Sequence, residues 1–315
     1  MFSVSNNGVL IYRTGTHSQE NLLKLFSRQQ GKITTLGKPA DYIHPRLSPD
    51  AKRVAYHMLE PTTGRTDIWI QELNNANRYR LTLDPTRSRT PVWSPDGKKL
   101  AYYSLRSGKS ALYIKDLNGV GTETEIREPD NILVGVPTDW TPDGSNLIVH
   151  ERQRTGKFEL SLVPVDPAKP SSHLLDIEGS AAGSAHISPN GWFAYESDES
   201  GDYEIYVTPY PPNFSGRVQV STGGGRTPRW ARGGKELFYL GSDHKLMVAE
   251  LSFSKNSAEV TSLKPLLPQP ILGRPDSYDV SKDGNWVVFE DEVGDHGLTP
   301  LDVVINWTSE LKLHP

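Results

Sequence analysis

The chain has 315 residues, of which 36% are hydrophobic and 23% charged, with a formal net charge of −4 at pH 7 and no cysteine. This composition is typical of a globular protein and not of a disordered one. There is no long basic stretch, which argues against a nucleic-acid surface. A chain without cysteine has no disulfide framework and no thiolate metal site. No apolar stretch approaches the length of a membrane span, and the first residues lack the pattern of a secretory signal.

One short motif recurs along the chain and sets the order of the predicted elements. Its strongest form is Trp93-Ser94-Pro95-Asp96-Gly97. Strong and weak copies together number seven, and successive copies lie 43 to 50 residues apart, with first residues Val4, Leu47, Trp93, Trp140, Ile187, Trp230 and Val280. A period of about 46 residues is typical of one propeller blade of four strands.

Each copy predicts the same strands in the same chain order. A short run ends at the first residue of the motif, and an apolar run such as 100–103 follows the turn. An alternating run such as 111–114 comes next, and a last short run such as 79–82 ends most copies. Short β-branched or aromatic runs separated by turn residues indicate strands. The end of the motif predicts a tight turn, because Gly, Asn and Asp tolerate positive φ. Ala51 stands there in the second copy, which predicts a turn of another type or a slightly strained one.

The repeat predicts the fold. Trp93, Trp140 and Trp230 are expected to pack between adjacent blades, and a closed ring of sheets covers every apolar face. We predict an all-β fold, a seven-bladed β-propeller of four-stranded antiparallel blades. Six blades are the alternative, in which the first and last copies jointly form one blade. Residues 1–315 form a single domain in this interpretation, with a ring seam between the last and first copies. The approximate repeats are 1–40, 41–87, 88–134, 135–181, 182–224, 225–273 and 274–315.

The position just before the motif is ionisable in five copies, which carry Arg46, Asp139, His186, Arg229 and Asp279 there, whereas the other two carry Ser3 and Val92. If the first strand of each copy lines the axis, these five side chains gather in an axial channel. They would then form either a ring of mutual salt bridges or a ligand-binding pocket, for example one that holds a peptide carboxylate with the two arginines. Strand parity also allows these side chains to turn between the blades.

The sequence predicts no catalytic residue and no cofactor. It contains neither a Gly-x-Ser-x-Gly nucleophile elbow nor a His-Glu-x-x-His metal motif. No metal site is predicted either. His44 and His186, in first-strand segments, are the residues to consider if ligands from different blades converge on the axis.

These motifs resemble the TolB-like propeller repeat, also called the WD40-like or PD40 repeat. The resemblance is carried by the Ser-Pro-Asp-Gly turn at 94–97, by its relatives at 48–51, 141–144 and 188–191, and by the stretch 197–206. A narrower likeness, over 2–15, 223–230 and 303–308, is to the C-terminal sensor-type propeller of some bacterial serine/threonine kinases. No kinase motif is present in this sequence.

The resemblance implies protein–protein interaction more than chemistry, although a fold alone says little about function. We predict a non-catalytic protein- or ligand-binding scaffold, the sensor or interaction part of a signalling or envelope protein. The alternative is a propeller enzyme, a metal-assisted lyase or hydrolase with an axial active site. The expected partner is a protein or peptide. Nucleic-acid binding and membrane insertion are not expected, and the chain is expected to be a monomer. Its location is expected to be periplasmic or otherwise extracytoplasmic within a longer TolB-like or kinase-linked protein, and cytoplasmic otherwise.

Overall fold

The computed structural model describes residues 2–4, 9–12, 20–60, 62–75, 77–83, 87–106, 110–118, 122–126, 132–176, 184–212, 216–255, 257–274, 276–293 and 302–305. The chain divides into two compact units, Met1–Gln19 with Val293–Pro315, and Glu20–Glu292. The expectation of a single domain over residues 1–315 stays a prediction.

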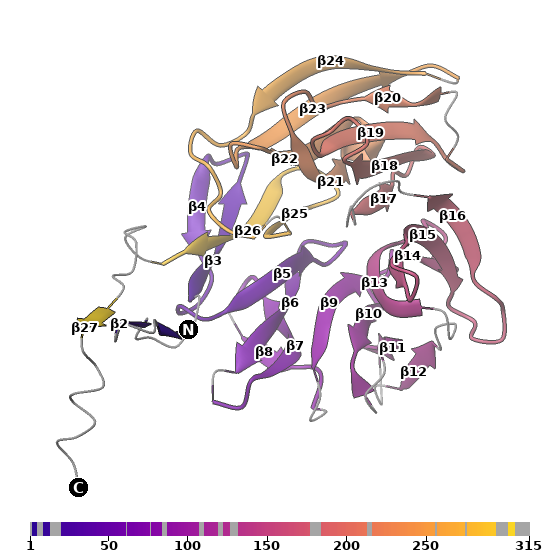
Figure 1. Ribbon diagram of the computed structural model, residues 1–315. Helices are drawn as coiled ribbons and strands as arrows, with labels where there is room; N and C mark the ends of the chain where they lie inside the picture. The colour runs from indigo at the N-terminus through magenta and orange to yellow at the C-terminus, as the bar shows by residue number, and fades with distance from the viewer. Residues whose placement is uncertain are drawn as a thin grey trace, which may run out of the picture. The chain divides into compact units, whose positions relative to one another are not determined.

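In the larger unit the described strands form six four-stranded antiparallel sheets, the blades of a propeller (Figure 1). Five blades are continuous in the chain. Given from the innermost strand outward, they are blade one, β5 (Tyr42–Leu47), β6 (Arg53–Glu60), β7 (Arg65–Glu72) and β8 (Arg78–Arg80); blade two, β9 (Ser88–Trp93), β10 (Lys99–Ser104), β11 (Ala111–Asp116) and β12 (Glu123–Ile126); blade three, β13 (Ile132–Trp140), β14 (Asn146–Gln153), β15 (Phe158–Pro164) and β16 (Ser172–Asp176); blade four, β17 (Ala185–Ile187), β18 (Trp192–Ser197), β19 (Glu204–Pro209) and β20 (Val218–Gln219); and blade five, β21 (Gly225–Ala231), β22 (Glu236–Gly241), β23 (Leu246–Phe253) and β24 (Ala258–Pro265).

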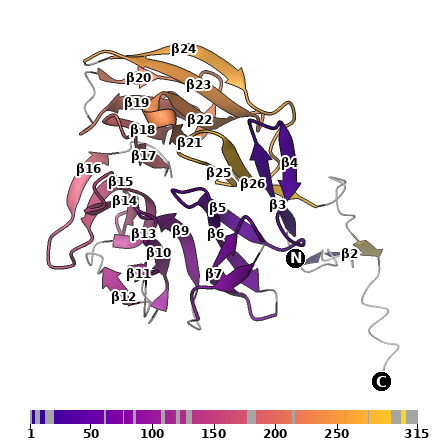
Figure 2. The same cartoon turned by 180° about the vertical axis from the view of Figure 1, so that it is seen from behind.

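Blade six is assembled from two distant parts of the chain. Its inner strands are β25 (Tyr278–Val280) and β26 (Trp286–Glu292), and its outer strands are β3 (Asn21–Ser27) and β4 (Lys32–Thr35). Strand β26 pairs with β3 in antiparallel register, from Trp286 opposite Ser27 to Glu292 opposite Asn21. Figure 2 shows this blade from behind, with β3 and β4 beside β26.

The prediction of seven blades is therefore wrong, and the six-bladed alternative is confirmed among the described residues. The expected seam between the last and first copies lies inside blade six, because the inner strands of the last copy pair with the later strands of the first copy. The early strands of the first copy, β1 (Phe2–Val4) and β2 (Val9–Tyr12), pair with β27 (Asp302–Ile305) in a three-stranded sheet of the smaller unit. The turn of the first copy, residues 5–8, lies outside the described residues.

The repeated motif forms the turn between the first two strands of a blade, as predicted. In blade two the N–H of Gly97 donates to the carbonyl of Ser94 at 2.9 Å, and Gly97 has a φ of 68°. Ala51 makes the same bond to Ser48 at 2.8 Å with a φ of 52°. Ala51 is thus the strained form of the same turn and not a turn of another type, because a left-handed φ is unfavourable for a residue with a Cβ atom.

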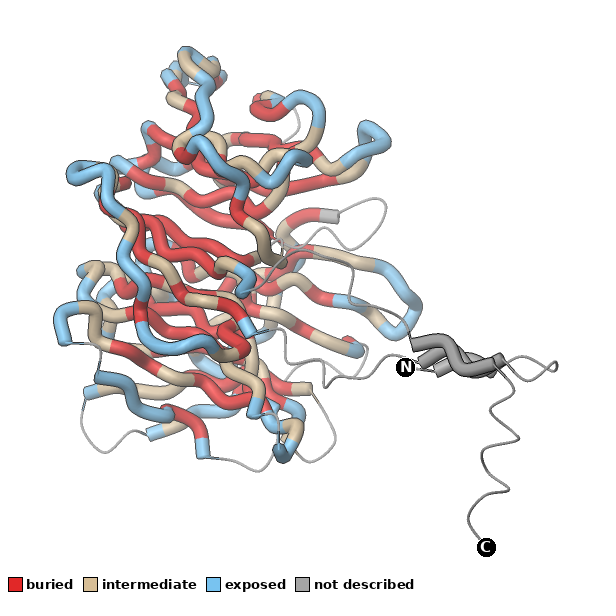
Figure 3. The backbone as a smooth tube through the Cα atoms, turned by 90° about the vertical axis from the view of Figure 1, so that its left-hand side faces the viewer, coloured by how far each residue is buried: buried red, intermediate tan, exposed pale blue. Residues whose placement is uncertain are grey.

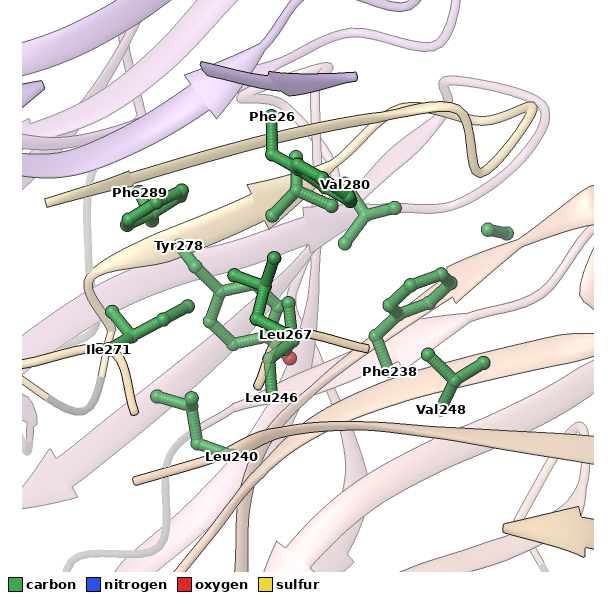
Figure 4. Close-up of a cluster of buried hydrophobic side chains, with 12 residues drawn as sticks. Phe26, Phe238, Leu240, Leu246, Val248, Leu267, Ile271, Tyr278, Val280 and Phe289 are labelled. Atoms are coloured by element: carbon green, nitrogen blue, oxygen red, sulfur yellow. The ribbon is translucent and has the colours of Figure 1, made fainter. Parts of the chain in front are cut away.

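The core consists of apolar clusters between neighbouring blades. Trp93, Trp140 and Trp230 each pack between two blades, as predicted. Figure 4 shows the cluster between blades five and six, where Phe238 and Val248 face Phe26, Tyr278 and Phe289. Another cluster joins blade six to blade one and so closes the ring. Figure 3 shows that buried residues lie along the strands and that exposed residues lie mainly in the connections.

Helical structure makes little contribution to the described part of the chain. A short 3-10 helix, η3 (Arg232–Gly234), takes the place of the turn in blade five. Among the described residues there is no helix with the length and apolar character needed to span a membrane.

Candidate functional site

The five ionisable residues that precede the motif line one cavity of about 310 Å³. They are Arg46 on β5, Asp139 on β13, His186 on β17, Arg229 on β21 and Asp279 on β25. Blade two contributes Val92 at the same position, so that all six innermost strands take part and the cavity lies on the propeller axis. The structure therefore brings together all five predicted residues, whereas Ser3 lies on β1 in the smaller compact unit.

The wall of this axial cavity comes from the motif itself. Trp93, Trp140 and Trp230 line it, together with the turn prolines Pro49, Pro95, Pro142 and Pro189. Lys282 lines it too, and its ammonium donates to the carbonyl of Pro95 at 3.0 Å, which links blade six to blade two. An apolar wall with a few convergent polar groups is the usual composition of a ligand pocket.

The two aspartates of the cavity also bind the neighbouring blades together. Asp279 Oδ2 accepts from the backbone N–H of Leu47 at 2.8 Å, and Asp139 Oδ2 accepts from that of Ile187 at 3.3 Å. In return, the indole N–H of Trp93 donates to the carbonyl of Arg46 at 2.9 Å. The aspartate side chains thus line the axis and reach the next blade, so both orientations weighed from the sequence occur.

His186 connects a cation to an anion. Its Nδ1 lies 3.2 Å from Asp139 Oδ2, and its Nε2 contacts the guanidinium of Arg229. Burial and then Arg229 lower the pKa of His186, although Asp139 acts in the opposite direction. Because a guanidinium only donates hydrogen bonds, Nε2 is the acceptor, and this assigns the ring proton to Nδ1. His186 is therefore neutral, and its ring links the guanidinium of Arg229 to the carboxylate of Asp139.

Arg229 carries the least satisfied polar group of the cavity. The residue is 4% exposed. Its Nε lies 3.3 Å from Asp279 Oδ1, and its Nη1 donates to Ser184 Oγ at 2.9 Å. Its Nη2 is buried and has no hydrogen-bond partner among the described residues. A buried donor without an acceptor costs about 1–3 kcal/mol. Nε makes no hydrogen bond among the described residues either, so both nitrogens are open donors of the site.

Asp276 is a site residue that sequence reasoning missed. Its carboxylate lies 3.8 Å from His44 Nε2, 3.9 Å from Arg46 Nη2 and 3.8 Å from Arg229 Nη2. Burial would raise the pKa of Asp276, but His44, Arg46 and Arg229 outweigh burial and hold that pKa below its usual value. Comparison of the copies does not find Asp276, because it lies in the connection before β25, where the sequence does not repeat.

The two histidines considered as metal ligands lie in different surroundings. His186 lines the axial cavity, whereas His44 does not and packs edge-on against the ring of His57, with ring centroids 5.0 Å apart. Burial lowers the pKa of His44 to about 4. In the part of the chain that the structure describes, no group of three or more His, Asp or Glu residues is placed to hold a metal ion.

Fold and repeat together define the class, a β-propeller built from repeats of four strands. The sequence profile of the TolB beta propeller domain, PD40, matches residues 28–191 and 88–297. The chain belongs to this family.

The curated proteins with similar sequences include one named a peptidase and one named for the Tol-Pal system. A stretch of 111 residues is 36% identical to the uncharacterized peptidase YuxL of Bacillus subtilis, over 33% of this chain and 16% of that protein. A stretch of 118 residues is 34% identical to the Tol-Pal system protein TolB of Hahella chejuensis, over 35% of this chain and 27% of that protein. The matched part thus spans 27% or less of these curated relatives.

A solved structure shares the fold. The structure of a protein described as TolB from Agrobacterium tumefaciens matches with a TM-score of 0.69 and 17% identity, over 88% of this chain and 99% of that chain. At this identity the match shows the fold alone. The narrower likeness to kinase-linked propellers stays a prediction.

Proposed function

We propose that the chain is a non-catalytic binding propeller whose axial cavity takes a peptide segment of a partner protein. In this proposal a carboxylate of the segment binds to Arg46 and Arg229. The observation that carries it is that Arg229, a residue of the cavity lining, has a buried Nη2 without a hydrogen-bond partner among the described residues. Guanidinium groups bind carboxylates strongly because the hydrogen bonds are charge-assisted.

The charged residues of the cavity lining favour a ligand with one anionic group. Its lining contains the cations Arg46, Arg229 and Lys282 and the anions Asp139 and Asp279, while His186 is neutral. One positive charge remains among the lining residues. Asp276, which is not one of them, lies 3.9 Å from Arg46 and 3.8 Å from Arg229 and offsets part of that charge, so the cavity complements at most a single carboxylate. The rest of an extended peptide would lie against the tryptophans and turn prolines of the wall, which bury apolar surface without ordering flexible side chains.

The motifs of the sequence support binding more than turnover. One relative is named for the Tol-Pal system and another is named a peptidase, and each matches over only part of its own length. The nucleophile elbow of many hydrolases is absent from this sequence. We therefore propose a protein or peptide partner for a chain that acts as a monomer.

Selection of random peptides on the purified chain, followed by calorimetric titration, tests the proposal. The selected peptides should share one acidic group, either a side chain or the C-terminus. Conversion of that group to an amide should weaken binding by about 1.5–3 kcal/mol, the value of a hydrogen bond to a charged group. Lys282→Glu reverses a charge on the exposed rim of the cavity and should weaken binding as well.

A matched control is Arg80→Met, which removes an arginine that pairs with Asp67 at 2.8 Å on blade one, outside the cavity. This variant should bind as the wild type does. Equal binding by wild type and Lys282→Glu would contradict the proposal. Cleavage of the selected peptides by wild type, reduced in Lys282→Glu, would instead favour the enzymatic alternative.

A further inference from the structure

A second cavity, of about 420 Å³, lies at the opposite end of β5 and β9. The axial cavity takes Arg46 and Val92 from these strands, whereas the second cavity takes residues near their starts, such as His44 and Thr90. The two cavities share no lining residue. The second cavity is therefore a separate feature, and nothing in the proposed axial function uses it.

Backbone distortion builds this second cavity. His44 and Thr90 have φ values of 54° and 49°, in the left-handed region, and each precedes a proline. Side chains of consecutive strand residues normally point to opposite faces. Here the alternation is broken, so that Ile43 and His44, like Arg89 and Thr90, line the same cavity. Such strain costs about 1–3 kcal/mol per residue and tends to occur at functional sites.

The distorted backbone itself is held by hydrogen bonds to the preceding blade. The N–H of His44 donates to Glu290 Oε1 at 2.9 Å, and the N–H of Thr90 donates to His57 Nδ1 at 3.3 Å. The backbone groups are thus satisfied. What remains open in the cavity belongs to the side chains.

Two of those side chains carry buried polar atoms without a partner among the described residues, Thr90 Oγ1 and His44 Nδ1. Thr90 is 7% exposed. Blade five offers a comparison, since Thr227 has a φ of 54°, precedes a proline, and donates its N–H to Glu196 Oε2 at 2.6 Å. Thr227 does not line this cavity and is not without a partner. The unpartnered hydroxyl is therefore particular to Thr90 and not a property of the distorted strand.

The charges of the cavity favour an anion. Arg89 donates through Nε to Thr66 Oγ1 at 3.4 Å and has no carboxylate partner among the described residues. Arg274 is balanced by Asp41 at 3.3 Å. Burial raises the pKa of nearby Glu290 to about 8, so that this carboxyl is largely neutral at pH 7 and does not cancel Arg89. One positive charge remains, which suits a singly charged carboxylate better than a doubly charged phosphate.

From these observations we infer that the second cavity binds a small organic acid. Its carboxylate accepts hydrogen bonds from the guanidinium of Arg89 and the hydroxyl of Thr90. Its apolar body lies against Ile43, Leu59 and Val136, which line the same cavity.

Calorimetric titration with hexanoate, hexanamide and inorganic phosphate tests this inference. Hexanoate should bind to the wild type, and hexanamide and phosphate should bind more weakly. Arg89→Met and Thr90→Val should each weaken hexanoate binding by about tenfold or more, the loss of a hydrogen bond to a charged group. Thr227→Val is the matched control and should bind hexanoate as the wild type does.

The melting temperature of the ligand-free protein gives a second test of the inference. Thr90→Val removes a buried hydroxyl without a partner and should raise the melting temperature of the free protein, whereas Thr227→Val should not. Equal hexanoate binding by wild type, Arg89→Met and Thr90→Val would overturn the inference, as would preferential binding of hexanamide or phosphate. Lys282→Glu, on the rim of the axial cavity, should leave hexanoate binding unchanged, so failure of the axial proposal is distinguishable from failure of this one.

Discussion

The two ends of the innermost strands satisfy their polar groups in different ways. At the turn end, which carries the motif, the bonds within each turn are local and repeat from blade to blade. Ser94 Oγ donates to Asp96 Oδ1 at 2.6 Å and accepts from the N–H of Lys99 at 2.9 Å. At the loop end, where the chain enters these strands, the bonds join different blades, and buried atoms such as Thr90 Oγ1 have no partner in the part of the chain that the structure describes. The turns of the motif thus hold each blade together, while each end of the strands has a cavity with a polar atom unmatched among the described residues, Arg229 Nη2 at the turn end and Thr90 Oγ1 at the loop end.

The largest expected effect is at the turn end. Trp93 is 6% exposed, packs between blades one and two, and donates its indole N–H to the carbonyl of Arg46. Trp93→Ala should lower the free energy of unfolding by about 3–5 kcal/mol, because it leaves a large cavity. Trp93→Phe should lose less, since it keeps most of the apolar contact. Equal losses measured by urea denaturation would show that packing is not the main contribution of Trp93.

A pH-dependent effect is expected at the loop end. Glu290 is 1% exposed, and burial raises its pKa to about 8 from the model-peptide value of 4.5. Between these pH values the folded state binds more protons than the unfolded state, so stability is highest below about pH 4.5 and is lost as the pH rises through 8. Glu290→Gln should remove this slope and still accept from the N–H of His44. At pH 8 the variant should be more stable than the wild type by on the order of 4 kcal/mol, because the wild type loses about 1.4 kcal/mol for each pH unit between 4.5 and 8.

Urea denaturation of wild type and Glu290→Gln from pH 5 to 8.5 measures this slope. Glu259→Gln, at an exposed position of β24, is the control and should retain the wild-type slope. Parallel curves for wild type and Glu290→Gln would show that Glu290 does not titrate in this range.

The smallest expected effect compares two turns of the motif. Ala51 has a left-handed φ of 52°, and Gly97 has 68° at the equivalent position. Ala51→Gly should raise the free energy of unfolding by about 0.5 kcal/mol, because relief of the left-handed strain slightly exceeds the entropy cost of glycine. Gly97→Ala should lower it by about 1 kcal/mol. Thermal denaturation of the two variants would contradict this account if both changes had the same sign.

Much of the architecture follows from the repeat. The period, the strand order, the turn after each innermost strand and the inter-blade tryptophans are all readable from the sequence. The blade number is not, because the repeat count assigns the first copy a blade of its own. In the structure β3 and β4 pair with β26, while β1 and β2 pair with β27.

The residues of the site are likewise only partly predictable from the sequence. The convergence of Arg46, Asp139, His186, Arg229 and Asp279 is predictable, because equivalent positions of a closed repeat meet at the axis. Asp276 and the second cavity are not predictable in this way. Asp276 lies in a connection that does not repeat, and the distorted starts of β5 and β9 depend on Glu290 and His57 of the preceding blades.

The sequence by itself determined that this protein is a ring of four-stranded blades with charged residues on its axis, because periodic burial and turn residues are local properties. Only the tertiary structure decided that there are six blades, that Asp276 joins the axial arginines, and that Thr90 and Arg89 share a cavity. These features depend on which distant strands pair and on which side chains of one blade reach the backbone of the next, and no local pattern specifies either.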